Sequence, residues 1–386
     1  MKSNYNQLGQ YIEMVSRTNS DLKYGIEDVR GCSNTKQMMQ TRANLIGRTY
    51  EKFIVLRPQE FVFNRRTTRN GEKIGMAYNN TDREYIFTND YVAFRVKQEY
   101  LDKLLPDYLY LFFCRDEFDR YARYKSTGSA TEFFNWEDMC AVPFEIPPMD
   151  FQQLVVNAYK VLNKRIETKQ KINDNLATQA LTLFSDFVSH LSKKLEQRKL
   201  GDVIASANTG GDAIQKVPIV DYDTGIKCAR VGDITNAREY ASWAFCNASK
   251  SVYDNYKLQA GDILVTRTAT LGITQYIAKD ILAVYNNGLI RLKVNDTNAL
   301  PLYIYWAMKT SDFLNYINQM NSATSVRPNM KIDYLLNYQL SIPSIEEQTQ
   351  FTNTVEPLMN AISLNNDEIL KLSEFQAIIL TTLSSR

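Results

Sequence analysis

Apolar and polar residues alternate along the chain in two distinct patterns. Short apolar runs bounded by Gly, Asn and Asp, such as 52–56, 60–63 and 261–265, are typical of buried β-strands. Two other stretches, which start after residues 148 and 344, place apolar residues three and four positions apart over many turns. That spacing is typical of long helices with one apolar stripe. The pattern therefore predicts an α+β fold in which β-rich segments alternate with long helices.

The two helical stretches keep the 4-3 spacing of a coiled-coil seam. The seam positions are Leu162, Ile166, Leu176 and Leu183 in the first stretch, and Ile362, Ile369, Leu372 and Ile379 in the second. Residues 150–199 carry a net charge of +4 and residues 346–386 a net charge of −4, so pairing of the two helices is favoured over self-pairing. The alternative is that each helix packs on its own β-rich unit. Pro357 should kink the second helix or delay its regular start.

The sequence also contains an internal duplication. Seven short matches recur in the same order at offsets between 192 and 202 residues. They include Leu8-Gly9 with Leu200-Gly201, Leu105-Pro106 with Leu300-Pro301, and Ile146-Pro147 and Gln152 with Ile342-Pro343 and Gln348. Seven collinear matches are not chance, so we expect two copies of one unit. The predicted boundaries are a first domain at 1–147, a helix at 148–199, a second domain at 200–343 and a helix at 344–386.

Composition narrows the class of protein. The 386 residues are 44% hydrophobic and 23% charged, which is the balance of a folded protein and excludes wholesale disorder. Five cysteines without a CxxC pair argue against a disulfide framework or a zinc site. No apolar run approaches the ~18 residues of a membrane span, and the N-terminus does not resemble a signal peptide. We therefore expect a cytoplasmic protein.

The search for catalytic chemistry is negative. The single histidine, His190, lies at the end of a helical pattern, which argues against a Ser-His-Asp triad or a histidine metal site. The sequence has no GxxxxGK(S/T) phosphate loop and no GxGxxG after a strand. It also lacks the aminomethyltransferase tetrad of Asn or Asp, two prolines and an aromatic residue. The sequence therefore predicts a protein with no catalytic centre, no metal site and no cofactor of its own.

Basic and hydroxyl side chains gather in loops that recur in both copies. Guanidinium groups, hydroxyls and amides are the groups that contact phosphates and base edges. The candidate DNA-binding residues in the first copy are Arg57, Arg65, Arg66, Arg69, Lys73, Lys125, Ser129 and Thr131. Those in the second copy are Thr266, Arg267, Thr268, Ser322, Thr324 and Arg327. A solvated surface explains any one loop about as well, but recurrence at matching places favours nucleic-acid binding. Arg267 is the best candidate for a base contact because it directly follows a strand.

The combination of these motifs resembles the specificity subunit of type I restriction-modification systems. Two β-rich units begin with Leu-Gly, contain Leu-Pro-x-Tyr-x-Tyr, and close with Ser-Ala-Thr, Ile-Pro and Gln before a long helix. The resemblance extends from Leu8 to Ser384. It implies two pseudo-symmetric α/β target-recognition domains joined by two long helices that form an antiparallel coiled coil. Because the first unit begins at Leu8, we expect that any further N-terminal segment of such relatives is missing.

The resemblance also implies a function and a set of partners. The chain would bind a bipartite double-stranded DNA target and direct adenine methylation and restriction by other subunits. Those partners would be two adenine methyltransferase subunits and nuclease–translocase subunits, which would carry S-adenosylmethionine and ATP. Since the basic loops of the two copies differ, the two half-sites should differ too.

Two alternatives remain at this stage. A non-catalytic scaffold could join two protein- or carbohydrate-binding domains through a coiled coil, but it would not explain the loops rich in Arg, Thr and Asn. An enzyme fused to a recognition module would need the catalytic motifs that the sequence lacks. Neighbouring genes for an adenine methyltransferase and a translocase nuclease would distinguish these alternatives.

Overall fold

A computed structural model of the chain describes residues 6–41, 45, 47–67, 73–128, 132–191, 197–211, 218–323 and 328–383, with only the backbone of 320–323. The chain divides into two compact units. The first unit is formed by Met1–Arg165 with Leu372–Arg386, and the second by Ile166–Lys371. Each unit therefore contains one β-rich segment and one part of each long helix.

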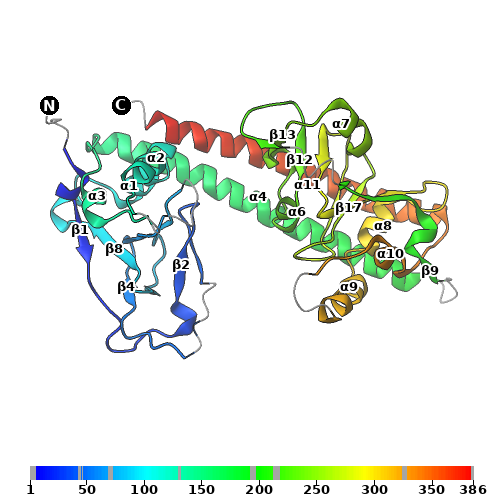
Figure 1. Cartoon of the computed structure of the whole chain (residues 1–386), viewed down its shortest axis with the longest axis horizontal. Helices are drawn as coiled ribbons and strands as arrows, with labels where there is room; N and C mark the ends of the chain where they lie inside the picture. The colour runs from blue at the N-terminus through cyan, green and yellow to red at the C-terminus, as the bar shows by residue number, and fades with distance from the viewer. Residues whose placement is uncertain are drawn as a thin grey trace. The chain divides into compact units, whose positions relative to one another are not determined.

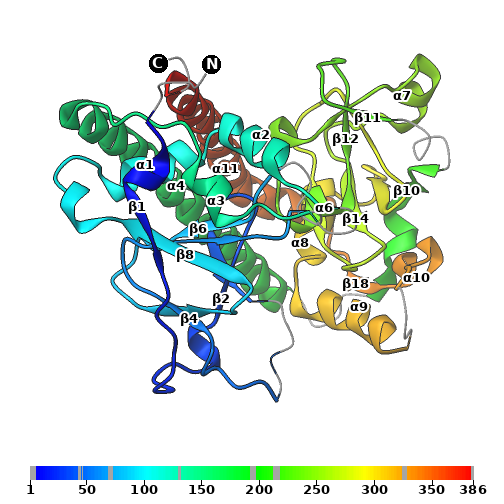
Figure 2. The same cartoon turned by 60° about the vertical axis from the view of Figure 1, so that its left-hand side comes forward.

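The first unit is built on a four-stranded antiparallel sheet in the order β1-β8-β5-β6, in which β1 lies beside β8 (Figure 2). Phe61 and Phe63 of β5 pack in one core with the helices, whereas Val62 between them packs in another core with β4 and β7. This alternation is the two-residue period of a strand that is buried on both faces. The elements of this unit are β1 (Ile12–Val15), β2 (Arg30–Cys32), β3 (Met38–Gln40), β4 (Ile54–Leu56), β5 (Phe61–Asn64), β6 (Met76–Tyr78), β7 (Tyr85–Phe87), β8 (Tyr91–Val96), α1 (Pro106–Phe113), α2 (Asp116–Lys125) and α3 (Trp136–Cys140).

The second unit repeats this arrangement with the sheet order β10-β17-β14-β15. Strand by strand, this order matches the first sheet, so the duplication predicted from the sequence is confirmed. The elements are β9 (Gln197–Lys199), β10 (Ile204–Thr209), β11 (Ile219–Val220), β12 (Lys227–Ala229), α6 (Val231–Thr235), β13 (Phe245–Cys246), α7 (Lys250–Tyr256), β14 (Ile263–Thr266), β15 (Thr274–Tyr276), β16 (Ala283–Tyr285), β17 (Leu289–Val294), α8 (Pro301–Ala307), α9 (Ser311–Ala323), α10 (Ile332–Leu336) and β18 (Gln339–Ser341).

The two copies differ in their smaller sheets. The second unit has a second four-stranded sheet in the order β11-β13-β12-β16, whereas the first unit has the two strand pairs β2·β3 and β4·β7. One parallel contact is nevertheless shared, because Ala229 pairs with Tyr285 in the same way as Val29 pairs with Ile86. The copies therefore share a central sheet and diverge around it.

The predicted long helices are α4 (Met149–His190) and α11 (Ile345–Thr382). In the second unit they lie side by side and run antiparallel (Figure 1), since Lys169 contacts Asn365 whereas Phe184, further along α4, packs on Phe351. The predicted seam residues of both helices are buried or half-buried. Pro357 lies inside α11, which begins at Ile345, so the prediction that proline delays the start of the helix is wrong.

The duplicated glutamines make equivalent hydrogen bonds in the two units. Gln152 is fully buried; its Oε1 accepts from the Leu105 amide (2.9 Å), and its Nε2 donates to the Lys103 and Pro147 carbonyls. Gln348 is also fully buried and repeats the contact with the Leu300 amide at 2.7 Å. Each glutamine thus ties the start of a long helix to the leucine that directly precedes the first proline of α1 or α8.

Replacing Gln348 with alanine should lower the free energy of unfolding by about 1–3 kcal/mol, because buried backbone groups lose their partners. Gln152→Ala should have a similar effect in the first unit. Gln350→Ala is the matched control, since Gln350 is an exposed glutamine of the same helix, and it should change stability by less than about 0.5 kcal/mol. Denaturant unfolding measures all three. Equal stabilities of the Gln348 and Gln350 variants would contradict this role.

Candidate nucleic-acid interface

The structure brings the two predicted contact loops of the first unit together. The chain that leaves β5 pairs with the segment after α2, through an isolated bridge between Arg66 and Phe133. Phe133 also bridges Thr127, and the Thr67 amide donates to the Glu132 carbonyl at 3.0 Å. The loop after β5 and the loop after α2 therefore form one surface, although about sixty residues separate them in sequence.

The second unit joins the corresponding loops in the same way. Thr268, which follows β14, bridges Asn329, which lies between α9 and α10. The Met330 amide donates to the Arg267 carbonyl at 2.8 Å. The same pairing of two polar loops thus occurs at equivalent places in both copies.

Two basic side chains on this surface of the first unit are exposed to solvent and form only weak ion pairs. Arg66 lies 3.4 Å from Asp90 and Lys73 lies 3.3 Å from Asp116, and each of these four side chains is at least half exposed. Such exposed pairs contribute about 0–1 kcal/mol, so a phosphate can replace the carboxylate at little cost. Arg57, which is 53% exposed, lies in the connection before β5, at the other end of that strand from Arg65 and Arg66, and it pairs with the less exposed Glu84.

Two further basic side chains make cation–π contacts with aromatic rings. The Arg65 guanidinium lies over the Phe133 ring at 5.7 Å, and Lys125 Nζ lies 5.9 Å from the rings of both Tyr121 and Tyr124. Tyr124 is 82% exposed. The surface therefore combines cations with aromatic faces, which is the composition that nucleic-acid contact requires.

In the second unit, two of the predicted contacts are corrected. Thr266 is fully buried, and its hydroxyl donates to the Thr270 carbonyl and accepts from the Ile273 amide. It closes the turn after β14 and cannot reach a nucleic acid, so the prediction for Thr266 is wrong.

Arg267 is half-buried and fastens the two loops of the second unit to each other. Its Nε donates to the Met330 carbonyl at 3.1 Å, and its Nη1 donates to the Asn287 carbonyl and side-chain oxygen. The guanidinium therefore already has protein partners, which argues against the prediction that Arg267 is the best base contact. Thr268, the next residue, is partly exposed.

The remaining predicted contacts cannot be placed. Arg69, Ser129, Thr131, Thr324 and Arg327 lie outside the described residues. Ser322 lies in the last turn of α9, where only the backbone is described.

Sequence reasoning missed two features of the first unit. Arg123 of α2 donates to Glu132 at 2.6 Å, which places a further cation on the candidate surface. Lys36 and Asp119 form a buried ion pair that also holds the backbone of Ile74, beneath the loop that carries Lys73. Burial lowers the pKa of Lys36, and the Asp119 carboxylate opposes this shift. No pattern in the sequence marked these charges as buried partners.

The helix seam contains polar as well as apolar contacts. In the second unit Ala180, Phe184, Phe351 and Val355 are buried in one core, and Lys169 of α4 pairs with Glu368 of α11 at 2.6 Å. This ion pair follows the predicted charge complementarity of the two helices. In the first unit Val155 and Val156 of α4 share a core with Leu383, beside α11.

The described part of the chain has no group of three or more His, Cys, Asp and Glu side chains that could hold a metal ion. None of its helices is long and apolar enough to span a bilayer.

Comparisons with known proteins agree with this geometry. The family model described as "Type I restriction modification DNA specificity domain" matches residues 33–178 and 192–374. The specificity subunit of the type I restriction enzyme MjaIX of Methanocaldococcus jannaschii is 22% identical over 313 residues, which cover 73% of this chain and 69% of that protein.

One solved structure shows a similar fold, and a second was matched at a lower score. The S subunit of a type I restriction-modification system from M. genitalium matches with a TM-score of 0.51 and 13% identity, over 98% of this chain and 96% of that one. The HsdS subunit of Thermoanaerobacter tengcongensis covers 98% of this chain and 95% of that one, with 15% identity and a TM-score of 0.35. The family match spans both copies of the duplication. The chain therefore belongs to the type I restriction-modification DNA specificity family, and its role is the non-catalytic recognition of DNA sequence within a restriction-modification complex.

Proposed function

We propose that each unit reads one half of a bipartite double-stranded DNA target, with the surface formed by its two paired loops. One observation carries this proposal. The loop after β5 and the loop after α2 are paired in the first unit, and their counterparts after β14 and α9 are paired in the second. The target-recognition domains are then residues 1–147 and 200–343, and the helices at 148–199 and 344–386 join them.

The proposed contact residues are the basic and hydroxyl residues of the two paired loops. In the first unit they are Arg65, Arg66, Lys73, Lys125 and the newly found Arg123, with Arg69, Ser129 and Thr131 proposed from the sequence, whereas Arg57 lies at the other end of β5. In the second unit they are Thr268, Ser322, Thr324 and Arg327, and Arg267 holds the two loops in place. The first surface is richer in cations, so the two half-sites differ in base sequence.

The helices also offer a surface for the partner subunits. In the first unit, Leu154 and Val161 of α4 are 68% and 67% exposed, and Phe375 and Ile378 of α11 are 55% and 56% exposed. Leu154 and Val161 are seven residues apart and so lie on one face of α4, and exposed apolar side chains grouped on one face favour a protein partner. We assign this surface to an adenine methyltransferase subunit, in a complex with two such subunits and nuclease–translocase subunits. S-adenosylmethionine and ATP belong to these partners, and the complex works in the cytoplasm.

Alanine variants of the basic residues test the proposal. Arg66→Ala should weaken binding to DNA of any sequence and reduce the slope of log K against log salt by about one, because one phosphate contact is lost. Loss of a base contact should instead relax one position of the target at a cost of about 1–3 kcal/mol. Arg267→Ala should lower the stability of the second unit by about 1–3 kcal/mol, since its buried hydrogen bonds are lost.

Arg95→Ala is the matched control for Arg66→Ala. Arg95 is a paired, partly exposed arginine near the opposite end of the same sheet, because β5 pairs Asn64 with Tyr91 and Phe61 with Phe94. Fluorescence anisotropy over a salt series, with the duplex identified by mapping methylated sites, measures each effect. If Arg66 and Arg95 variants bind DNA equally well, the paired loops are not the contact surface.

A further inference from the structure

A chain of hydrogen bonds interrupts the apolar seam between α4 and α11 in the second unit. Lys169 of α4 pairs with Glu368 of α11 and donates to Asn365 Oδ1 at 2.9 Å. Asn365 Nδ2 in turn donates to Asn173 Oδ1 on α4 at 2.8 Å. These side chains are partly buried, so each bond joins the two helices in a region shielded from water.

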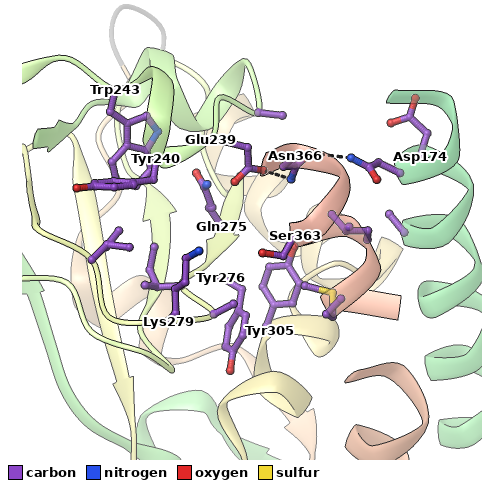
Figure 3. Close-up of a pocket in the computed structure, with 18 of the residues that line it drawn as sticks. Asp174, Glu239, Tyr240, Trp243, Gln275, Tyr276, Lys279, Tyr305, Ser363 and Asn366 are labelled. Atoms are coloured by element: carbon purple, nitrogen blue, oxygen red, sulfur yellow. Dashed lines mark hydrogen bonds between the residues drawn. The ribbon is translucent and has the colours of Figure 1, made fainter. Parts of the chain in front are cut away.

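The same chain of bonds continues from the helices to the β-rich segment. Asn173 Nδ2 donates to Asn366 Oδ1 at 2.7 Å, and Asn366 Nδ2 donates to Glu239 Oε1 at 2.7 Å (Figure 3). Asn173 and Asn366 thus each donate one bond and accept another. Glu239 directly precedes the short helical turn Tyr240–Ser242, in the segment between α6 and β13.

A pocket lies beside the bond between Glu239 and Asn366. The pocket has a volume of about 570 Å³, and Glu239, Trp243 and Gln275 of the β-rich segment line it together with Asn366 of α11 (Figure 3). Trp243 belongs to a core with Ala229 and Tyr285, whereas α4 and α11 pack in a different core with β14 and β17. Strands β14 and β17 contribute to both cores, and the exposed bond from Asn366 to Glu239 adds a direct polar connection between α11 and the segment that carries Trp243.

We propose that Asn173, Asn365, Asn366 and Glu239 are positioning residues that determine the spacing of the two half-sites. A purely apolar seam allows one helix to shift along the other. Half-buried amide groups need hydrogen-bond partners, and they have them in the observed register of the two helices. Glu239 then fixes the β11-β13-β12-β16 sheet to that register. This inference rests on the proposed function, since spacing has meaning only for a bipartite target.

The chemistry of Glu239 supplies a conservative variant. Loss of hydration raises the pKa of its carboxyl, and the nearby Asp367 carboxylate adds to this shift while Lys279 opposes it. The bond from Asn366 needs only an acceptor oxygen, which glutamine also provides. Glu239→Gln should therefore keep the connection, and Glu239→Ala should lose it.

The first experiment reads the helix register without DNA. Spin labels at the exposed positions 179 and 360, in a chain whose native cysteines are replaced by alanine, should give one narrow distance by double electron–electron resonance. Replacing Asn173, Asn365 and Asn366 together with leucine should leave the melting temperature unchanged or higher but broaden this distance distribution. An unchanged narrow distribution in the triple variant would overturn the proposal, whatever its DNA affinity.

The second experiment uses the chain assembled with its methyltransferase partners and duplexes whose gap is the native length or one base pair longer. We expect wild type and Glu239→Gln to discriminate between these duplexes equally. The ratio of the affinities for the native and the longer gap should fall at least fivefold in Glu239→Ala and in the triple variant. Their affinity for the native gap should stay close to that of the wild type. Wild-type discrimination in both variants would overturn the proposal, whereas absence of specific binding by the wild type would contradict the proposed function itself.

Discussion

Replacing Asp119 with alanine should lower the free energy of unfolding of the first unit by about 3–5 kcal/mol, because the change leaves a buried lysine without its partner. Lys36 and Asp119 form an ion pair in which the side chains are 4% and 7% exposed. Asp119 also accepts from the Ile74 amide at 3.0 Å, and Lys36 donates to the Ile74 carbonyl at 2.8 Å. One substitution therefore removes two interactions and leaves a charge in an apolar core.

Helix α2 contains its own control for this experiment. Asp116 lies one turn before Asp119 and pairs with Lys73, but these side chains are 70% and 51% exposed. Asp116→Ala should therefore change stability by about 0–1 kcal/mol. Denaturant unfolding of both variants measures the difference. Similar small changes in the two variants would mean that the pair of Lys36 with Asp119 does not hold this core together.

The stability of Asp119→Ala should depend on pH in a characteristic direction. Burial already lowers the pKa of Lys36, and the variant lacks the carboxylate that opposes this shift. The unfolded state then binds more protons than the folded state between the lowered pKa and the ordinary value near 10.5. Stability therefore rises with pH in this window as Lys36 becomes neutral. A variant that loses further stability on going from pH 7 to pH 9.5 would contradict this assignment.

The same pair links the core to the candidate interface. Ile74 lies just before β6, in the connection that begins after β5 and carries Lys73. Loss of Asp119 should therefore weaken DNA binding as well, with the second unit intact. Arg66→Ala differs, because it should weaken binding without a change in unfolding. Comparison of the two variants separates a side chain that supports the surface from one that contacts DNA.

The sequence was sufficient to predict the duplication and the long helices, because both depend on regular spacing. The matched glutamines illustrate where such prediction ends. Their recurrence at 152 and 348 was visible in the sequence, but their hydrogen bonds join residues 47 or 48 positions apart and needed the fold. Asp119 and Lys36 are separated by 83 positions, and isolated charges in a sequence are usually solvated.

The predictions for Thr266 and Arg267 show a different limit. Thr266 was chosen because its loop matches the basic loop of the first copy, and Arg267 because it directly follows a strand, whose end can present a side chain to solvent. Thr266 is instead the last residue of β14, where its side chain points into the protein and closes the turn. Arg267 faces the neighbouring loop and binds its carbonyls. A shift of one residue along a strand reverses the face, so the choice required the register.

The second large effect that we expect is a change in half of the DNA target when one domain is exchanged. A block of residues 197–343 from a relative should change one half of the methylated motif and leave the other half as it was. The block must carry β9 and β18 together, because Gln197 pairs with Ser341 and Lys199 with Gln339. The donor must also keep the Leu-Pro helix start, since Gln348 of the recipient binds the Leu300 amide.

A block of residues 197–336 is the matched control for this exchange. It brings the donor's β9 but keeps the recipient's β18, so the two strands no longer come from one protein and the stability of the second unit should fall. Sequencing of methylated sites in cells that express each chimera with its partners gives the result directly. Among the residues that the structure describes, the bridges of the paired loops in each unit join segments of that same unit, so we expect each surface to bind DNA independently. A chimera of the 197–343 block that changes both halves of the motif, or neither, would therefore show that the units do not read DNA independently.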